Sequence, residues 1–261
     1  MGGIYSISSH EYSRGYTFLD TMNPEAMEPY GLALLAYCEG DAEAQLIVRR
    51  DDGTEAPLPA SQFFRPPEQF FPIEVGALER CRGHVLDIGA GTGLHSLVLQ
   101  SRGLAVTAID ISPEAVAIMR EAGVEDARRV DVFGFDDGPF DTLLMLGHGI
   151  GIVEDLGGLD RFLAHAQRLV RSDGHVLLHS NDVRKTKDPG NLAYHEANRR
   201  AGRYIGEIRM QFIFGNEVGP VCGWLHVDPE TLGHHAEQSG WACAVVVEEE
   251  SGDYLARLTL Q

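Results

Sequence analysis

The segment GHVLDIGAGTGLHSLVLQ, residues 83–100, combines residue types and a spacing that suit ligand chemistry. A short apolar run reaches Asp87, three glycines follow at every second position (Gly89, Gly91 and Gly93), and a helix-like segment comes next. Glycines between a strand and a helix let the backbone approach a ligand closely. The sequence therefore predicts a ligand site at the carboxyl end of this first strand.

Two cofactor classes use a glycine loop between a strand and a helix. Dinucleotide-binding proteins prefer G-x-G-x-x-G, whose third glycine lets the helix pack closely on the strand. Here Leu94 takes the sixth position, and the third glycine comes one residue early. Asp87, two residues before the first glycine, is unsuited to a pyrophosphate and suits a cationic ligand. An NAD-dependent oxidoreductase is therefore the least favoured function.

The loop resembles motif I of the class I S-adenosylmethionine-dependent methyltransferases, because VLDIGAGTG (residues 85–93) matches D-x-G-x-G-x-G at every defining position. The resemblance implies that Asp110, at the end of the next apolar run, binds both ribose hydroxyls. A carboxylate suits this role because it can accept two hydrogen bonds from a cis-diol. The resemblance also implies that Asp131 lies near the adenine amino group.

The cofactor that this resemblance implies is S-adenosyl-L-methionine, with S-adenosyl-L-homocysteine as the product. Arg65, in the segment before the loop, would pair with the methionine carboxylate, which motif I does not neutralise. The glycines can also be purely steric, and His95 is expected to make a packing or cofactor contact. The expected cofactor contacts are Asp87, Gly89, Gly91, Gly93, Leu94, His95, Asp110, Ile111, Asp131, Val132, Leu146, Gly147 and Arg65.

Strand and helix patterns alternate over residues 83–180, which predicts a doubly wound, mostly parallel α/β sheet. SPEAVAIMREAG (112–123) indicates a helix with Ser112 as its N-cap. FDTLLMLG (140–147) is almost continuously apolar, as expected for a strand buried on both faces. The resemblance covers this region, returns over 228–260, and implies a seven-stranded sheet with an antiparallel last strand.

We expect an N-terminal cap or lid with helical parts over residues 1–80 and an S-adenosylmethionine-binding methyltransferase domain over 81–261. The alternation breaks at an insertion of about residues 183–227. It contains two strand-like runs, EIRMQFIF (207–214) and VCGWLHV (221–227), joined by GNEVGP. These runs predict a late β-hairpin that folds over the carboxyl edge of the sheet.

The segment LGHGIG (146–151) stands where the resemblance implies an acceptor-facing loop. Family members that methylate nucleobase amines or side-chain amides carry an Asn/Asp-Pro-Pro-Tyr-type motif there, which this chain lacks. His148 is the first catalytic candidate, because an imidazole can take up a proton near neutral pH. It can equally line the cofactor tail or cap the following helix. His179, at the carboxyl end of a later strand, is the second candidate.

An aromatic acceptor pocket is expected from the lead-in segment and the insertion, and such a pocket fits a small organic molecule. The phenylalanines can equally pack the cap onto the core. The hairpin can equally form a dimer face, so a monomer and a homodimer both stay open. The candidate acceptor contacts are Phe64, Phe71, Asn181, Tyr194 and Trp224.

The bulk composition limits the classes of partner that are expected for this protein. Lys and Arg number 21 against 39 Asp and Glu, giving a formal charge of −18, which disfavours nucleic acid and anionic membranes as partners. The four cysteines form no C-x-x-C pair, and no clustered ligand set implies a metal. With no long apolar run and a polar start, a cytoplasmic location is expected. MGGIYS also fits the short N-myristoylation pattern, which is common by chance.

These observations predict a cytoplasmic S-adenosylmethionine-dependent methyltransferase that acts on O or N of a small-molecule acceptor. A peptide or protein side-chain methyltransferase is the first alternative. The second alternative is a protein that binds the cofactor as a sensor or auxiliary subunit without transferring the methyl group.

Overall fold

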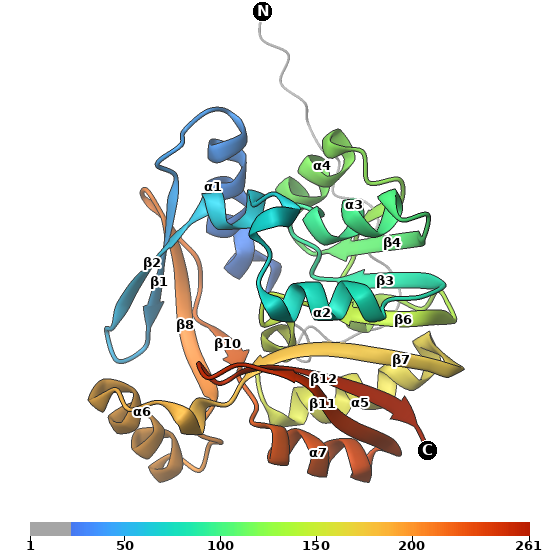
Figure 1. Cartoon of the computed structure of the whole chain (residues 1–261). Coiled ribbons are helices and arrows are strands. Elements are labelled where there is room, and N and C mark those ends of the chain that lie inside the picture. Colours follow the sequence, from blue (N-terminus) through green and yellow to red (C-terminus); the bar gives the residue numbers. More distant parts are fainter. Residues whose placement is uncertain (1–21) are drawn as a thin grey trace, which may run out of the picture.

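The computed structural model describes residues 22–261 and contains two β-sheets (Figure 1). The N-myristoylation pattern at Gly2 and Ser6 and the first part of the expected cap lie outside the described residues. Within the described part of the chain, no helix has the length and apolar character needed to cross a membrane.

The larger sheet has seven strands in the order β11-β12-β7-β6-β3-β4-β5. All neighbouring strands pair in parallel except β12, which is antiparallel to both β7 and β11. This arrangement confirms the predicted sheet and its antiparallel last strand. The strands are β3 (His84–Ile88), β4 (Ala105–Asp110), β5 (Ala127–Arg129), β6 (Phe140–Met145), β7 (Val170–Asn181), β11 (Trp241–Glu248) and β12 (Asp253–Leu260).

Helices cover both faces of this sheet, as the uninterrupted apolar strands require. Val85 belongs to the apolar cluster that includes Leu99 of α3, whereas the next residue, Leu86, belongs to the cluster that includes Phe162 of α5. Ser112 caps α4 as predicted, because its Oγ accepts the Ala115 N–H at 3.2 Å. The covering helices are α2 (Pro72–Arg80), α3 (Leu94–Ser101), α4 (Pro113–Ala122), α5 (Leu156–Leu169) and α7 (Pro229–Gln238).

The second sheet joins two segments that are far apart in the sequence, with the order β10-β8-β1-β2 and with β9 paired to β8. The predicted hairpin is confirmed, because β8 and β10 pair antiparallel with Met210 opposite Cys222. On its other side β8 pairs with β1, with Val48 opposite Phe212. Its strands are β1 (Gln45–Arg50), β2 (Glu55–Pro59), β8 (Glu207–Phe214), β9 (Glu217–Val218) and β10 (Cys222–Leu225).

The expected N-terminal cap and late insertion therefore share one sheet, and the strands β1 and β2 were not foreseen in the sequence. Helix α1 (Glu28–Cys38) packs on β8 and on α4, and α6 (Pro189–Arg200) precedes β8. The shorter 3-10 helices are η1 (Pro24–Met27), η2 (Ala60–Phe64), η3 (Pro67–Gln69), η4 (Val132–Gly134), η5 (Gly149–Val153) and η6 (Val183–Lys185).

Candidate active site

A cavity of about 620 Å³ lies at the carboxyl edge of the seven-stranded sheet. The ends of β3, β4 and β7 and the loop after β6 form part of its wall. The second sheet forms another part, through side chains such as Val48, Phe212 and Trp224. The cavity thus lies between the two sheets, at the edge where open α/β folds bind ligands.

The glycine loop after β3 forms one end of this cavity. Gly89, Gly91 and Gly93 all have left-handed backbone angles, with φ of 68°, 58° and 79°. A Cβ on Gly91 would lie 2.8 Å from Tyr30 Oη, and one on Gly93 would lie 2.7 Å from Val124 Cγ2. Gly89 and Gly91 line the cavity, whereas Gly93 lets α3 pack closely against its neighbours.

The acids predicted beside this loop are held by hydrogen bonds. Asp110 accepts the N–H groups of Gly91 and Ser112, each at 2.9 Å, so its carboxylate fixes the loop as well as facing the cavity. Asp87 accepts the Ser96 hydroxyl at 2.6 Å, and Asp131 accepts the Phe133 N–H at 2.7 Å. Burial raises the pKa of all three carboxyl groups.

Arg65 is bound to Glu74 at the cavity wall. Its two terminal nitrogens lie 3.1 and 2.9 Å from the Glu74 carboxylate oxygens, and His95 Nε2 lies 2.8 Å from the same carboxylate. The Phe71 N–H donates to Glu74 at 2.7 Å. A cofactor carboxylate would have to share Arg65 with Glu74.

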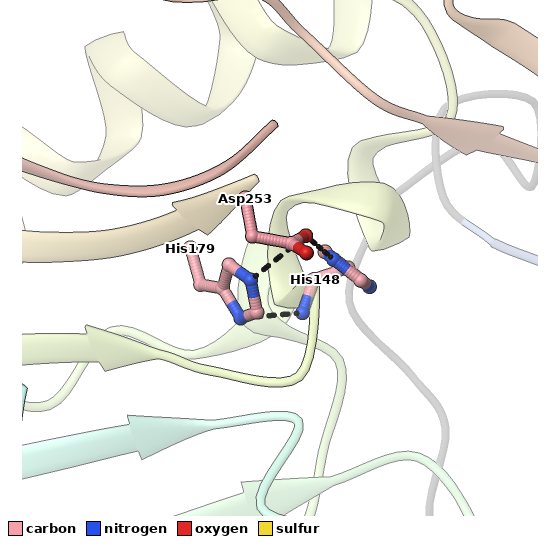
Figure 2. Close-up of side chains that lie close together, drawn as sticks. All are labelled: His148, His179 and Asp253. Carbon is pink, nitrogen blue, oxygen red and sulfur yellow. Dashed lines mark hydrogen bonds and ion pairs between the residues drawn. The ribbon is translucent and has the colours of Figure 1, made fainter. Parts of the chain in front are cut away.

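Three side chains gather at the other end of the cavity: His148, His179 and Asp253 (Figure 2). His148 Nε2 lies 2.6 Å from Asp253 Oδ1, and His179 Nε2 lies 3.6 Å from the same oxygen. His148 has φ 57° and ψ 32°, a left-handed conformation that is uncommon for a residue other than glycine. Such a conformation recurs at functional sites, where the surrounding structure holds it.

The hydrogen bond between the two histidines fixes a tautomer. The main-chain N–H of His148 donates to His179 Nδ1 at 3.2 Å, so a neutral His179 carries its proton on Nε2, toward Asp253. The distances of this cluster also suit a metal ion. Ligation through His179 Nε2 would require that nitrogen to give up its proton, which the hydrogen bond to Nδ1 opposes. The arrangement is therefore better suited to moving a proton than to holding a metal.

Asp253 reaches the cluster because β12 is antiparallel. Its first residue, Asp253, pairs with Asn181 at the carboxyl end of β7. Asn181 Nδ2 donates to Asp253 Oδ1 at 3.0 Å, and Ser251 Oγ donates to Oδ2 at 2.9 Å. Hydrogen bonding, foremost to His148, holds the pKa of Asp253 far below its usual range.

His226, just after β10, lies beside the cluster, with its ring centroid 5.2 Å from that of His148. Burial, reinforced by His148, lowers the pKa of His226 to about 3. Trp224 packs against the loop after β6, where a Cβ on Gly151 would lie 2.0 Å from the indole. The last glycine of LGHGIG therefore makes room for the cavity-lining tryptophan.

The structure brings most of the sequence-predicted residues to this cavity. All expected cofactor contacts except Gly93 line it, as do both catalytic candidates, His148 and His179. Among the expected acceptor contacts, Phe71 and Trp224 line the cavity.

The other three expected acceptor contacts are not among the residues that line this cavity. Phe64 stacks on Tyr37, with ring centroids 4.8 Å apart. The Tyr194 hydroxyl donates to Asp51 at 2.7 Å, and Asn181 Nδ2 donates to Asp253 Oδ1 at 3.0 Å.

Several cavity residues were missed in the sequence. Asp253 could have been found, because an antiparallel last strand must begin beside the carboxyl end of the strand it pairs with. Tyr30, Met27 and Phe133 also line the cavity, but no motif signals them. Glu249, which precedes the turn into β12, was missed as well.

Comparisons with known proteins identify the family of this chain. Residues 86–178 match the methyltransferase-domain family. An S-adenosylmethionine-dependent methyltransferase from Bacteroides fragilis, solved in complex with S-adenosyl-L-homocysteine, is 34% identical, with a TM-score of 0.80. That similarity covers 93% of this chain and 99% of the other. The chain therefore belongs to the S-adenosylmethionine-dependent methyltransferases.

More distant similarity connects the chain to named relatives. A demethylmenaquinone methyltransferase from Tropheryma whipplei is 30% identical over 99 residues, which are 36% of this chain and 40% of that protein. A ubiquinone biosynthesis O-methyltransferase from Xylella fastidiosa is 47% identical over 47 residues, which are 18% of this chain and 19% of that protein. The chain thus spans less than half the length of these two relatives.

Proposed function

We propose that this protein transfers the methyl group of S-adenosyl-L-methionine to O or N of a small-molecule acceptor. The observation that carries the proposal is the single cavity that runs from the glycine loop to the His148, His179 and Asp253 cluster between the two sheets. A cavity of this size, with mostly apolar walls and a few polar groups, suits a small organic ligand rather than a protein surface.

The cofactor occupies the glycine-loop end in this proposal. Asp110 binds the ribose hydroxyls, Asp131 lies at the adenine, and Gly89 and Gly91 give room for close approach. Gly147 would hold the methionine end, and the methyl group would then be offered to an acceptor at the histidine end. The product at this end is S-adenosyl-L-homocysteine.

The reaction is an in-line displacement on carbon. A lone pair on the acceptor forms a bond to the methyl carbon, the carbon–sulfur bond breaks, and its electron pair stays on sulfur as a thioether. The donor is already activated by its positive charge, so the protein contributes alignment and removes the acceptor's proton.

His148 is the group that takes this proton in our proposal. Its Nε2 is engaged by Asp253, and Nδ1 has no partner among the described residues. An Nε2–H that donates to Asp253 leaves the Nδ1 lone pair for the acceptor's proton. Asp253 acts as a positioning residue that orients the imidazole and stabilises its protonated form. His179 supports the same carboxylate.

The surroundings of the enzyme follow from charge and cysteine usage. We propose a cytoplasmic enzyme without nucleic-acid or membrane partners. A net charge of −18 repels phosphate-rich partners, and the four cysteines are unpaired. Sedimentation of the purified protein would distinguish a monomer from a homodimer.

The test is transfer of radiolabel from S-adenosyl-L-methionine into a host-cell extract separated into low-mass and protein fractions. We expect label in the low-mass fraction, and we expect His148→Gln to abolish it while S-adenosyl-L-homocysteine still binds. Label in protein alone would indicate a side-chain methyltransferase. Cofactor binding without label in either fraction would indicate a sensor.

A further inference from the structure

Two buried side-chain atoms in the described part of the chain lack a hydrogen-bond partner, His226 Nδ1 and Glu249 Oε1, and a third, His179 Nε2, lies 3.6 Å from Asp253 Oδ1, beyond hydrogen-bond distance. All three residues line the cavity. Leaving a buried polar atom unpaired costs its desolvation free energy, so native proteins rarely do so without a reason. Their concentration at one end of one cavity indicates a site for the polar group of a ligand.

The charge of the cavity wall limits which polar group fits. Besides the acids near the glycine loop, the lining contains Glu249 and Asp253, and the Glu249 N–H donates to the main-chain oxygen of Asp253 at 2.8 Å. Among the described residues, Arg65 is the one guanidinium group that lines the cavity, Glu74 already holds it through both terminal nitrogens, and no lysine contributes. An anionic group would meet carboxylates here without a free cation to pair with, which costs affinity.

We propose that the acceptor is a primary or secondary small-molecule amine, which enters as an ammonium ion, pairs with Glu249 and is methylated on nitrogen. This inference rests on the proposed function and narrows it from O or N to N. Glu249 supplies an unpaired acceptor oxygen, and the ammonium supplies the N–H donors that this oxygen lacks. Trp224 and Phe212 also line the cavity, and aromatic rings attract cations.

The proposed chemical step begins with the loss of a proton from the ammonium ion. The ammonium gives one proton to His148 Nδ1, which leaves a lone pair on nitrogen. That lone pair forms the nitrogen–carbon bond as the carbon–sulfur bond breaks. The positive charge passes from sulfur to nitrogen in this step, so the product forms directly as a methylated ammonium ion, and the proton on His148 is released to solvent. No oxidant, reductant or metal enters the balance.

The test compares two samples of the low-mass extract, one untreated and one acylated with N-hydroxysuccinimide acetate and then treated with hydroxylamine. Acylation blocks primary and secondary amines, and hydroxylamine restores any acylated hydroxyl groups. We expect labelled methyl transfer in the untreated sample and at least a tenfold loss in the acylated one. Equal labelling of both samples would overturn the amine assignment while the proposed function stands. Labelling of neither would contradict the proposed function itself.

A pair of variants tests the role of Glu249. Against the untreated extract, Glu249→Gln should lower the rate at limiting acceptor at least tenfold and leave the affinity for S-adenosyl-L-homocysteine unchanged. Glu250→Gln, which removes an exposed neighbouring carboxylate, is the matched control and should behave as the unmodified protein. Equal rates for the two variants would remove Glu249 from the acceptor site.

Discussion

The hydrogen bonds to Glu74, at the wall of the cavity, are predicted to stabilise the folded protein. This carboxylate is buried, with 5% of its side chain exposed, and it joins Arg65, His95 and the main chain of Phe71. Burial alone would raise the pKa of Glu74. Hydrogen bonds from His95, from the Phe71 N–H and from Arg65 outweigh it and lower the pKa from 4.5 to about 2.

The lowered pKa of Glu74 sets the size of its contribution to the free energy of unfolding. Lowering a pKa from 4.5 to about 2 corresponds to about 3 kcal/mol of folding stability when the group is ionised in both states. Because the folded-state pKa is the lower one, this contribution is present above pH 4.5 and is lost as the pH falls toward 2. We therefore expect Glu74→Gln to destabilise the protein by about 3 kcal/mol at pH 7 and by about 2 kcal/mol at pH 3.5.

Urea denaturation of the unmodified protein and of Glu74→Gln over this pH range measures both values. Glu79→Gln is the matched control, because it removes an exposed carboxylate from the same helix and should change stability by less than about 0.5 kcal/mol. A stability difference for Glu74→Gln that stays constant between pH 7 and pH 3.5 would refute the electrostatic reasoning. It would assign the loss to packing.

Three further predictions concern the cavity. Asp110→Ala should weaken S-adenosyl-L-homocysteine binding by about 1.5–3 kcal/mol in calorimetric titration, the scale of a charged hydrogen bond, and unchanged affinity in a folded variant would remove its ribose role. Gly91→Ala should lower stability by about 1–3 kcal/mol through its φ of 58° and its contact with Tyr30, and adding Tyr30→Phe should recover part of that loss in denaturation experiments. EDTA should leave methyl transfer unchanged, because the His179 tautomer opposes metal ligation, whereas activity lost to EDTA and restored by Mn²⁺ or Zn²⁺ would show a metal enzyme.

The seven-stranded sheet and the glycine-loop end of the cavity could be predicted because their signals are local. The glycine loop, the apolar strands and the cap at Ser112 each depend on residues that are close in the sequence. Gly93 was expected as a cofactor contact, but it does not line the cavity, and a Cβ there would lie 2.7 Å from Val124 Cγ2, so this motif position serves close packing.

The second sheet and the histidine cluster depend instead on distant pairings. The β1 sequence QLIVRR carries no clear alternation, and its partner β8 comes from the late insertion. Asp253 meets His148 only through the register of β12 against β7. Tyr194 was expected at the acceptor because of its aromatic ring, yet its hydroxyl is used to join α6 to Asp51. The sequence gives no direct signal for the β1–β8 pairing or for the Tyr194 contact, whereas the antiparallel last strand does place Asp253 at the carboxyl end of β7.

The pairing of β1 with β8 has a consequence for altering the acceptor specificity of this enzyme. Residues of the early strands and residues of the late insertion cover the cavity as parts of one hydrogen-bonded sheet. A chimera that exchanges only the insertion with that of a related enzyme would give residues 47–50 of β1 foreign neighbours on β8. The early strands β1 and β2 and the late insertion therefore have to be exchanged together.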